Sequence, residues 1–154
     1  MKLKNSKMDI AMEIICFAAL VGMTAFLVSE WSGMPEKIPM HYDWAGNIDR
    51  WGKKSELLFL PIMTWGLYAF ITFLEQIPQI WNTGVTVTEE NKVRVYRVLK
   101  YMIKTLKLFF VLSFVYMVFH SVTMTNLPTW FTWVSILGPI VLIVFWIVRL
   151  LQVK

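Results

Sequence analysis

Four long apolar runs constrain this chain more than any other feature of its sequence. They fall at about 10–30, 57–76, 104–122 and 130–150, and each is close to the ~20 residues that a helix needs to cross the core of a bilayer. Charged residues make up only 16% of the chain, whereas a soluble domain has about 25%. The sequence therefore predicts an all-α fold, in which a single domain over 1–154 forms a four-transmembrane-helix bundle in a lipid bilayer.

The first apolar run follows a basic start, as a secretory signal peptide would. Its apolar stretch is longer than the ~7–15 residues of a signal-peptide core, and no small-residue cleavage pattern is obvious before Trp31. We therefore expect the run to be retained as a membrane helix. Cys16, the single cysteine of the chain, is expected to pack there as a small apolar residue.

The basic residues are divided unevenly between the two sides that four crossings would create. Eleven lie in the two termini and between the second and third runs, against four between the first and second runs. The four are Lys37, Arg50, Lys53 and Lys54. Because cytoplasmic loops are enriched in Lys and Arg, both termini are predicted to be cytoplasmic and the long loop between helices 1 and 2 to be outside. The same distribution argues against nucleic acid as the partner behind the net charge of +5.

The segment between the second and third runs is predicted to contain a basic amphipathic helix over 88–104. Thr88 is of the residue type that caps a helix start, and apolar and basic residues alternate after it. We expect this helix to run into the third span, with Lys104 and Lys107 extending to the lipid head groups. Two roles are open for it, an anchor on the membrane surface and a contact for a cytoplasmic protein.

The loop predicted to lie outside, 31–56, carries the most unusual chemistry of the chain. A long loop is usually either functional or disordered, and the prolines, glycines and aromatic residues of this one argue against disorder. Pro35 and Pro39 favour an extended backbone, whereas Gly46-Asn47 and Gly52 are turn signals. The loop is therefore expected to fold back over the outer face of the bundle.

Three side chains near the expected turn leave two interpretations open. His41, Asp43 and Asp49 are of the types that bind zinc or another divalent ion, and they also suit acid–base chemistry. Alternatively, the aspartates accept backbone N–H groups and His41 bonds to a carboxylate, which makes the set a structural cap. His120 and Glu30 lie at the outer ends of their helices and are candidates to join the same cluster. Because no established metal-binding spacing is present, we favour the structural cap.

Two further functions are weighed against a non-enzymatic role. A metal-binding protein or metal-dependent membrane enzyme would use the His and Asp residues of the loop, with His120 as a further ligand. A small transporter or transporter subunit would use acidic residues inside the membrane. Glu13 and Glu75 are predicted to lie near the ends of their spans, so they give little support to a proton relay. The common nucleophile and phosphate-loop motifs are missing, which argues against an enzyme.

The outer loop resembles the signature of a bacterial membrane family called domain of unknown function 1648. The pattern of that family is a proline, Ile-Pro-x-His, a glycine, an aspartate, Trp-Gly and a lysine. The matching residues are Pro35, Ile38-Pro39-Met40-His41, Gly46, Asp49, Trp51-Gly52 and Lys54. Asp43 stands where the family usually has Asn or Asp, and Leu60-Pro61 also fits.

The resemblance implies a multi-pass protein of the bacterial cell membrane. The family is related to the N-terminal part of an immunity protein against a sporulation-delaying peptide toxin. By this resemblance the chain would sense, or give immunity to, a membrane-active peptide outside the cell and signal to a cytoplasmic protein. The signature residues would then form a ligand-binding or structural motif without catalytic residues.

Overall fold

The computed structural model describes residues 3–154 and is mostly helical. In this range the long helices are α1 (Lys7–Glu30), α2 (Phe59–Leu74), α3 (Lys92–Thr123) and α4 (Thr129–Gln152). All four are long and apolar enough to cross a membrane, α2 together with the 3₁₀ turn η1 (Lys54–Leu58) before it. The prediction of four helices long and apolar enough to span a membrane is confirmed.

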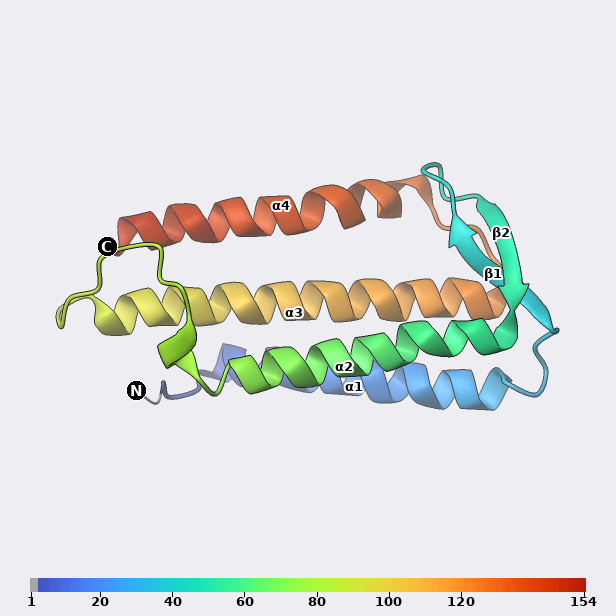
Figure 1. Ribbon diagram of the computed structural model, residues 1–154, viewed down its shortest axis with the longest axis horizontal. Coiled ribbons are helices and arrows are strands. Elements are labelled where there is room, and N and C mark those ends of the chain that lie inside the picture. The colour runs from blue at the N-terminus through green and yellow to red at the C-terminus, as the bar shows by residue number, and fades with distance from the viewer. Residues whose placement is uncertain (1–2) are drawn as a thin grey trace.

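Helix α3 is the centre of the bundle. Helices α1 and α2 pack along one side of it and α4 along the other (Figure 1). Most of α4 is exposed and apolar, as expected for a helix that faces lipid. Both chain termini lie at one end of the bundle, which we call the termini end, and the α1–α2 connection lies at the opposite, hairpin end (Figure 1).

The helix starts near the termini end show how local sequence sets the helix boundaries. Ser6 and Asp9 form a capping box before α1, in which each side chain accepts a hydrogen bond from the backbone N–H of the other. The predicted basic helix and the third span form one continuous helix, α3. The residue that caps α3 is Asn91; Thr88, expected in that role, accepts from the N–H of Asn91 one turn earlier.

The apolar core lies between α1 and α3 and extends to the hairpin end. Leu20 of α1, Val111 and Val118 of α3 and Ile38 of the α1–α2 connection are fully buried in it. Cys16 is also buried there, in agreement with its expected role in packing. A close-packed apolar core of this kind leaves little room for water between the helices.

The α1–α2 connection contains a β-hairpin, which corrects the all-α prediction. Strands β1 (Lys37–Tyr42) and β2 (Ile48–Lys53) pair antiparallel. The register places Lys37 opposite Lys53 and Tyr42 opposite Ile48, with an irregularity around His41. The sequence predicts the turns and an extended backbone at Pro35 and Pro39, but it does not predict that two strands pair here. The hairpin caps one end of the bundle (Figure 1).

There is also a short 3₁₀ turn, η2 (Pro78–Ile80), between α2 and α3 at the termini end. It follows Glu75, which caps the end of α2. The indole N–H of Trp81 donates to the carbonyl of Leu74 at 2.9 Å. This hydrogen bond ties the connection back onto the end of α2 and holds Glu75 close to α3.

Candidate functional site

The tip of the hairpin is fastened to the α3–α4 connection and to the first residue of α4 by several hydrogen bonds. Leu127 N donates to the carbonyl of Gly46 at 2.8 Å, and Ile48 N donates to the side chain of Asn126 at 3.1 Å. Thr129 Oγ1 donates to the carbonyl of Ala45 at 3.0 Å. The hairpin therefore joins the first helix pair to the second.

Gly46 is required at this contact for two reasons. Its φ of 89° lies in the left-handed region, which side-chain-bearing residues adopt with strain. A Cβ atom added at Gly46 would also collide with the carbonyl oxygen of Leu127. The glycine of the sequence signature is thus explained by packing.

Asp43 organises the turn of the hairpin. Its Oδ1 accepts from the backbone N–H groups of Ala45 at 2.9 Å and Asn47 at 2.8 Å. These bonds, chiefly the one from the Asn47 backbone, hold the pKa of Asp43 below its usual value, because they stabilise the carboxylate form. This geometry supports a structural role for Asp43 in the turn.

The remaining candidate metal ligands have separate partners. His41 Nδ1 lies 2.6 Å from Asp49 Oδ1 across the hairpin, whereas His120 Nδ1 bonds to Thr125 Oγ1 at 2.8 Å. Glu30 is exposed at the end of α1. Among residues 3–154, no three His, Cys, Asp or Glu side chains are grouped closely enough to hold a metal ion. The structure brings His41 and Asp49 together, and zinc binding by the wider set stays a prediction.

The last signature residues hold the end of the hairpin against α1. Lys54 Nζ lies 5.4 Å from the ring centre of Trp31 and 3.7 Å from Glu36 Oε1. Trp51, by contrast, is 51% exposed, and Trp44 near the tip is 75% exposed. The hairpin is therefore fixed on the bundle while presenting two large aromatic side chains outward.

A second site, at the termini end, was missed by sequence reasoning. Glu75, at the end of α2, lies 2.7 Å from Lys104 Nζ and 2.8 Å from Lys107 Nζ. Glu13 of α1 lies 2.9 Å and 2.8 Å from the same two nitrogens. We call these four residues the charge cluster. It joins α1, α2 and α3 with equal numbers of positive and negative charges.

The charge cluster is buried, which corrects the expected position of its lysines. The side chains of Lys107, Glu75 and Lys104 are 1%, 4% and 5% exposed, and that of Glu13 is 31% exposed. Lys104 and Lys107 therefore do not extend to the head groups. Lys107 lies about 24 Å from the hairpin end of α3 at 1.5 Å per residue, and the apolar core of a bilayer is about 30 Å thick. By these figures Lys107 lies inside the apolar core, about 6 Å from its nearer boundary, and a charge there is costly unless it is paired.

Polar neighbours complete the cluster. Tyr68 Oη donates to Glu13 Oε1 at 2.7 Å, and Lys107 also donates to Thr72 Oγ1 at 3.0 Å. Closer to the chain termini, Asp9 Oδ2 lies 3.4 Å from both Lys100 and Arg97. Its other oxygen, Oδ1, has no hydrogen-bond partner among residues 3–154. A second, smaller ionic group thus continues the cluster toward the end of the bundle.

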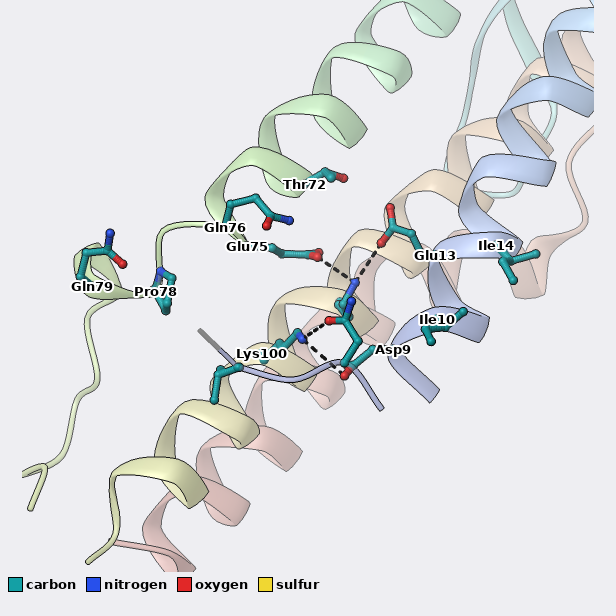
Figure 2. A pocket seen from close by; sticks show the side chains of 13 residues that line it. Asp9, Ile10, Glu13, Ile14, Thr72, Glu75, Gln76, Pro78, Gln79 and Lys100 are labelled. Atoms are coloured by element: carbon teal, nitrogen blue, oxygen red, sulfur yellow. Dashed lines mark hydrogen bonds and ion pairs between the residues drawn. The ribbon is translucent and has the colours of Figure 1, made fainter. Parts of the chain in front are cut away.

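An open cavity of about 590 Å³ lies beside both ionic groups. Figure 2 shows Glu13 of α1 and Glu75 at the end of α2 facing each other across it, with Asp9 and Lys100 nearer the chain termini. Gln76 and Gln79 form part of its wall on the η2 side. The arrangement can bind a small charged or polar group.

One signal in the sequence points to this cluster. Lys100, Lys104 and Lys107 are spaced so that they share one face of a helix, as do Asp9 and Glu13. A charged face on a helix that is otherwise apolar must meet an opposite charge or water. This spacing could have indicated such a face, but only the tertiary structure shows which helices it meets and how deeply it is buried in the bundle.

A family model described as "Domain of unknown function (DUF1648)" matches residues 14–65. This match supports the resemblance to the DUF1648 family that the hairpin signature indicates. No curated protein and no solved structure matches the chain. The DUF1648 match contains the whole hairpin and its signature. It begins after Glu13 and ends before Glu75 and α3, so all four residues of the charge cluster lie outside it.

Proposed function

We propose that this integral membrane protein is non-enzymatic and binds a membrane-active peptide at its hairpin end. In this proposal the protein resides in a bacterial cell membrane with both termini in the cytoplasm, and the hairpin recognises the peptide. The observation that carries the proposal is a rigidly held hairpin with an exposed strand and two exposed tryptophans.

The exposed strand is β2, whose Asp49, Arg50 and Trp51 are all exposed. Within residues 3–154, β2 pairs only with β1. An edge strand presents unpaired backbone groups to which an extended peptide can add as a further strand. Trp44 and Trp51 supply apolar surface for the side chains of such a peptide.

The attachment of the hairpin tip provides a route for a signal. Because Gly46 bonds to Leu127 just before α4 and Ala45 bonds to Thr129, its first residue, a peptide that shifts the hairpin would also shift the start of α4. The basic part of α3, from Lys92, would present the response to a cytoplasmic protein. Immunity requires only that the hairpin captures the peptide. Sensing also requires that the response reaches a cytoplasmic protein.

Peptide binding can be tested with the full chain in lipid nanodiscs. The probes are a labelled amphipathic membrane-active peptide and an analogue methylated on alternate backbone nitrogens, with empty nanodiscs as the reference for lipid binding. The unmodified peptide is expected to bind more tightly to the protein-containing discs, and W44A or W51A to weaken that binding several-fold. Equal binding of the methylated analogue would contradict strand addition.

Trp133 of α4 supplies the matched control for this test. It is 55% exposed, a similar fraction to that of Trp51, but it is not part of the hairpin. W133A is expected to leave peptide binding unchanged. If W133A weakened binding as much as W51A, the tryptophans would act only as general membrane anchors, and the hairpin would not be the recognition surface.

A small transporter or transporter subunit is the second candidate function, favoured by the charge cluster beside an open cavity. Glu13 is its most accessible carboxylate and would exchange a proton with the cavity. Proton flux into liposomes that contain the protein tests this function. E13Q should abolish the flux, whereas E36Q on the exposed α1–α2 connection should not. Absence of flux from the unmodified protein would eliminate the candidate.

A further inference from the structure

An apolar groove runs between α3 and α4 at the termini end, separate from the charge cluster. It is open to the surroundings and has a volume of about 480 Å³. Residues from both helices line it, among them Arg94, Arg97 and Tyr101 of α3 and Phe145, Trp146 and Arg149 of α4. We call it the arginine groove.

The floor of the arginine groove is made of aromatic rings. Tyr101 and Trp146 stack with ring centres 5.8 Å apart and planes inclined by 26°. Their polar atoms are already bonded, the hydroxyl of Tyr101 to Ser6 and the indole N–H of Trp146 to Thr105. Phe145 beside them is 52% exposed. The floor therefore offers apolar surface without competing donors.

The rim of the groove is positively charged. Arg94 is exposed and has no ion-pair partner among residues 3–154, and Arg149 bonds only to the side chain of Gln152 there. Arg97 is partly neutralised by Asp9, 3.4 Å away. No carboxylate lines the groove in the described part of the chain. Two guanidinium groups thus remain for an anionic ligand.

We propose that the arginine groove binds an anionic phospholipid. The phosphate binds to Arg94 and Arg149, and the acyl chains cover Phe145 and Trp146 and continue along the exposed apolar side of α4. Arginine suits phosphate because its planar group donates two parallel hydrogen bonds. Basic pockets between membrane helices bind lipid head groups in this way.

Charge complementarity and position select this occupant over others. A free phosphate would use the arginines but leave the aromatic floor uncovered, and an apolar helix of a partner would cover the floor but leave the arginines unpaired. A phospholipid satisfies both parts of the groove. The groove also lies at one end of the membrane-spanning helices, where head groups are found whichever way the protein is oriented.

The test is the affinity of the full chain for phosphatidylglycerol and phosphatidylcholine with identical acyl chains, measured by native mass spectrometry from detergent. Phosphatidylglycerol is expected to bind more tightly. The R94Q/R149Q variant should lose most of that preference, about fivefold for each arginine removed. Both side chains are exposed, so the variant is expected to fold normally. Glycerol 3-phosphate, which has the phosphate without acyl chains, should not compete.

The matched control is K92Q/K154Q, which removes the same charge from the termini end outside the groove. It should retain the preference for phosphatidylglycerol. Equal losses in the two double variants would show that net charge alone attracts the lipid and would overturn the proposal. Competition by glycerol 3-phosphate would show that the groove binds phosphate without needing the acyl chains, and would overturn the proposal as well.

Discussion

The two ends of the bundle are stabilised by different kinds of interaction. At the hairpin end, backbone hydrogen bonds, a left-handed glycine and an exposed His41–Asp49 pair shape a segment close in sequence. At the termini end, the charge cluster joins three helices through buried ion pairs between residues distant in sequence. Exposed pairs contribute little to stability, whereas breaking a buried one is costly. The two ends should therefore respond very differently to mutation.

The largest effect is expected from E75A in the charge cluster. It leaves the buried amines of Lys104 and Lys107 with Glu13 as their single acidic partner, and breaking a buried pair in this way costs about 3–5 kcal/mol. The free energy of unfolding in detergent, followed by circular dichroism, measures the loss. E36A changes an exposed carboxylate at the opposite end and should cost much less.

The double variant E75M/K107M sharpens the same test. It removes one charge of each sign and leaves Glu13 paired with Lys104. Replacement of a buried pair by apolar residues is often neutral, so most of the stability lost in E75A should return. If the double variant were as unstable as E75A, the cluster would not act through charge balance.

The second largest effect is expected from G46A at the hairpin end. It combines the strain of a positive φ with a collision against the Leu127 carbonyl, at a cost of about 2–3 kcal/mol. Thermal unfolding is the measurement. Gly84 provides the control, because its φ is 63° but a Cβ there meets nothing within 4 Å. G84A should therefore cost only the strain, about 1 kcal/mol.

A smaller effect is expected from H41A or D49A. Their side chains are 64% and 42% exposed, and exposed ion pairs contribute at most about 1 kcal/mol. Either substitution should change the free energy of unfolding only slightly. The difference between the variant and the unmodified protein should become smaller still at high salt. A loss as large as that of E75A would mean that the pair holds more than the hairpin, such as a bound ion.

The smallest effect is a change with pH in the hairpin turn. Asp43 has a pKa below its usual value of 3.8, so its contribution to stability is complete above that value and is lost as the pH falls through its lowered pKa. The NMR signals of the Ala45 and Asn47 amides should shift in this acidic range. D43N keeps an acceptor oxygen without the titration and should abolish the shift, whereas a shift that persists would assign it to another group.

The hairpin end could be predicted in large part because its interactions are local. The turn at Gly46-Asn47, the capping role of Asp43 and the His41–carboxylate bond are all expected from neighbouring residues. The contacts of the hairpin tip with Asn126 and Leu127 could not be predicted, because those residues are far along the chain. The strands themselves were missed because Pro39 and the short polar stretch of β2 resemble a loop.

The sequence by itself determined the class of this protein. Four apolar runs of spanning length leave a chain no other way to satisfy its backbone hydrogen bonds in a bilayer than to form helices. Only the tertiary structure decided where its membrane-buried charges lie and which groups they pair with. Lys104 and Lys107 have side chains long enough to reach either the head groups or a buried carboxylate. The packing of α1 and α2 on α3 places Glu13 and Glu75 within reach of these lysines. Pairing with the carboxylates is then more favourable than extending the lysine side chains to the head groups.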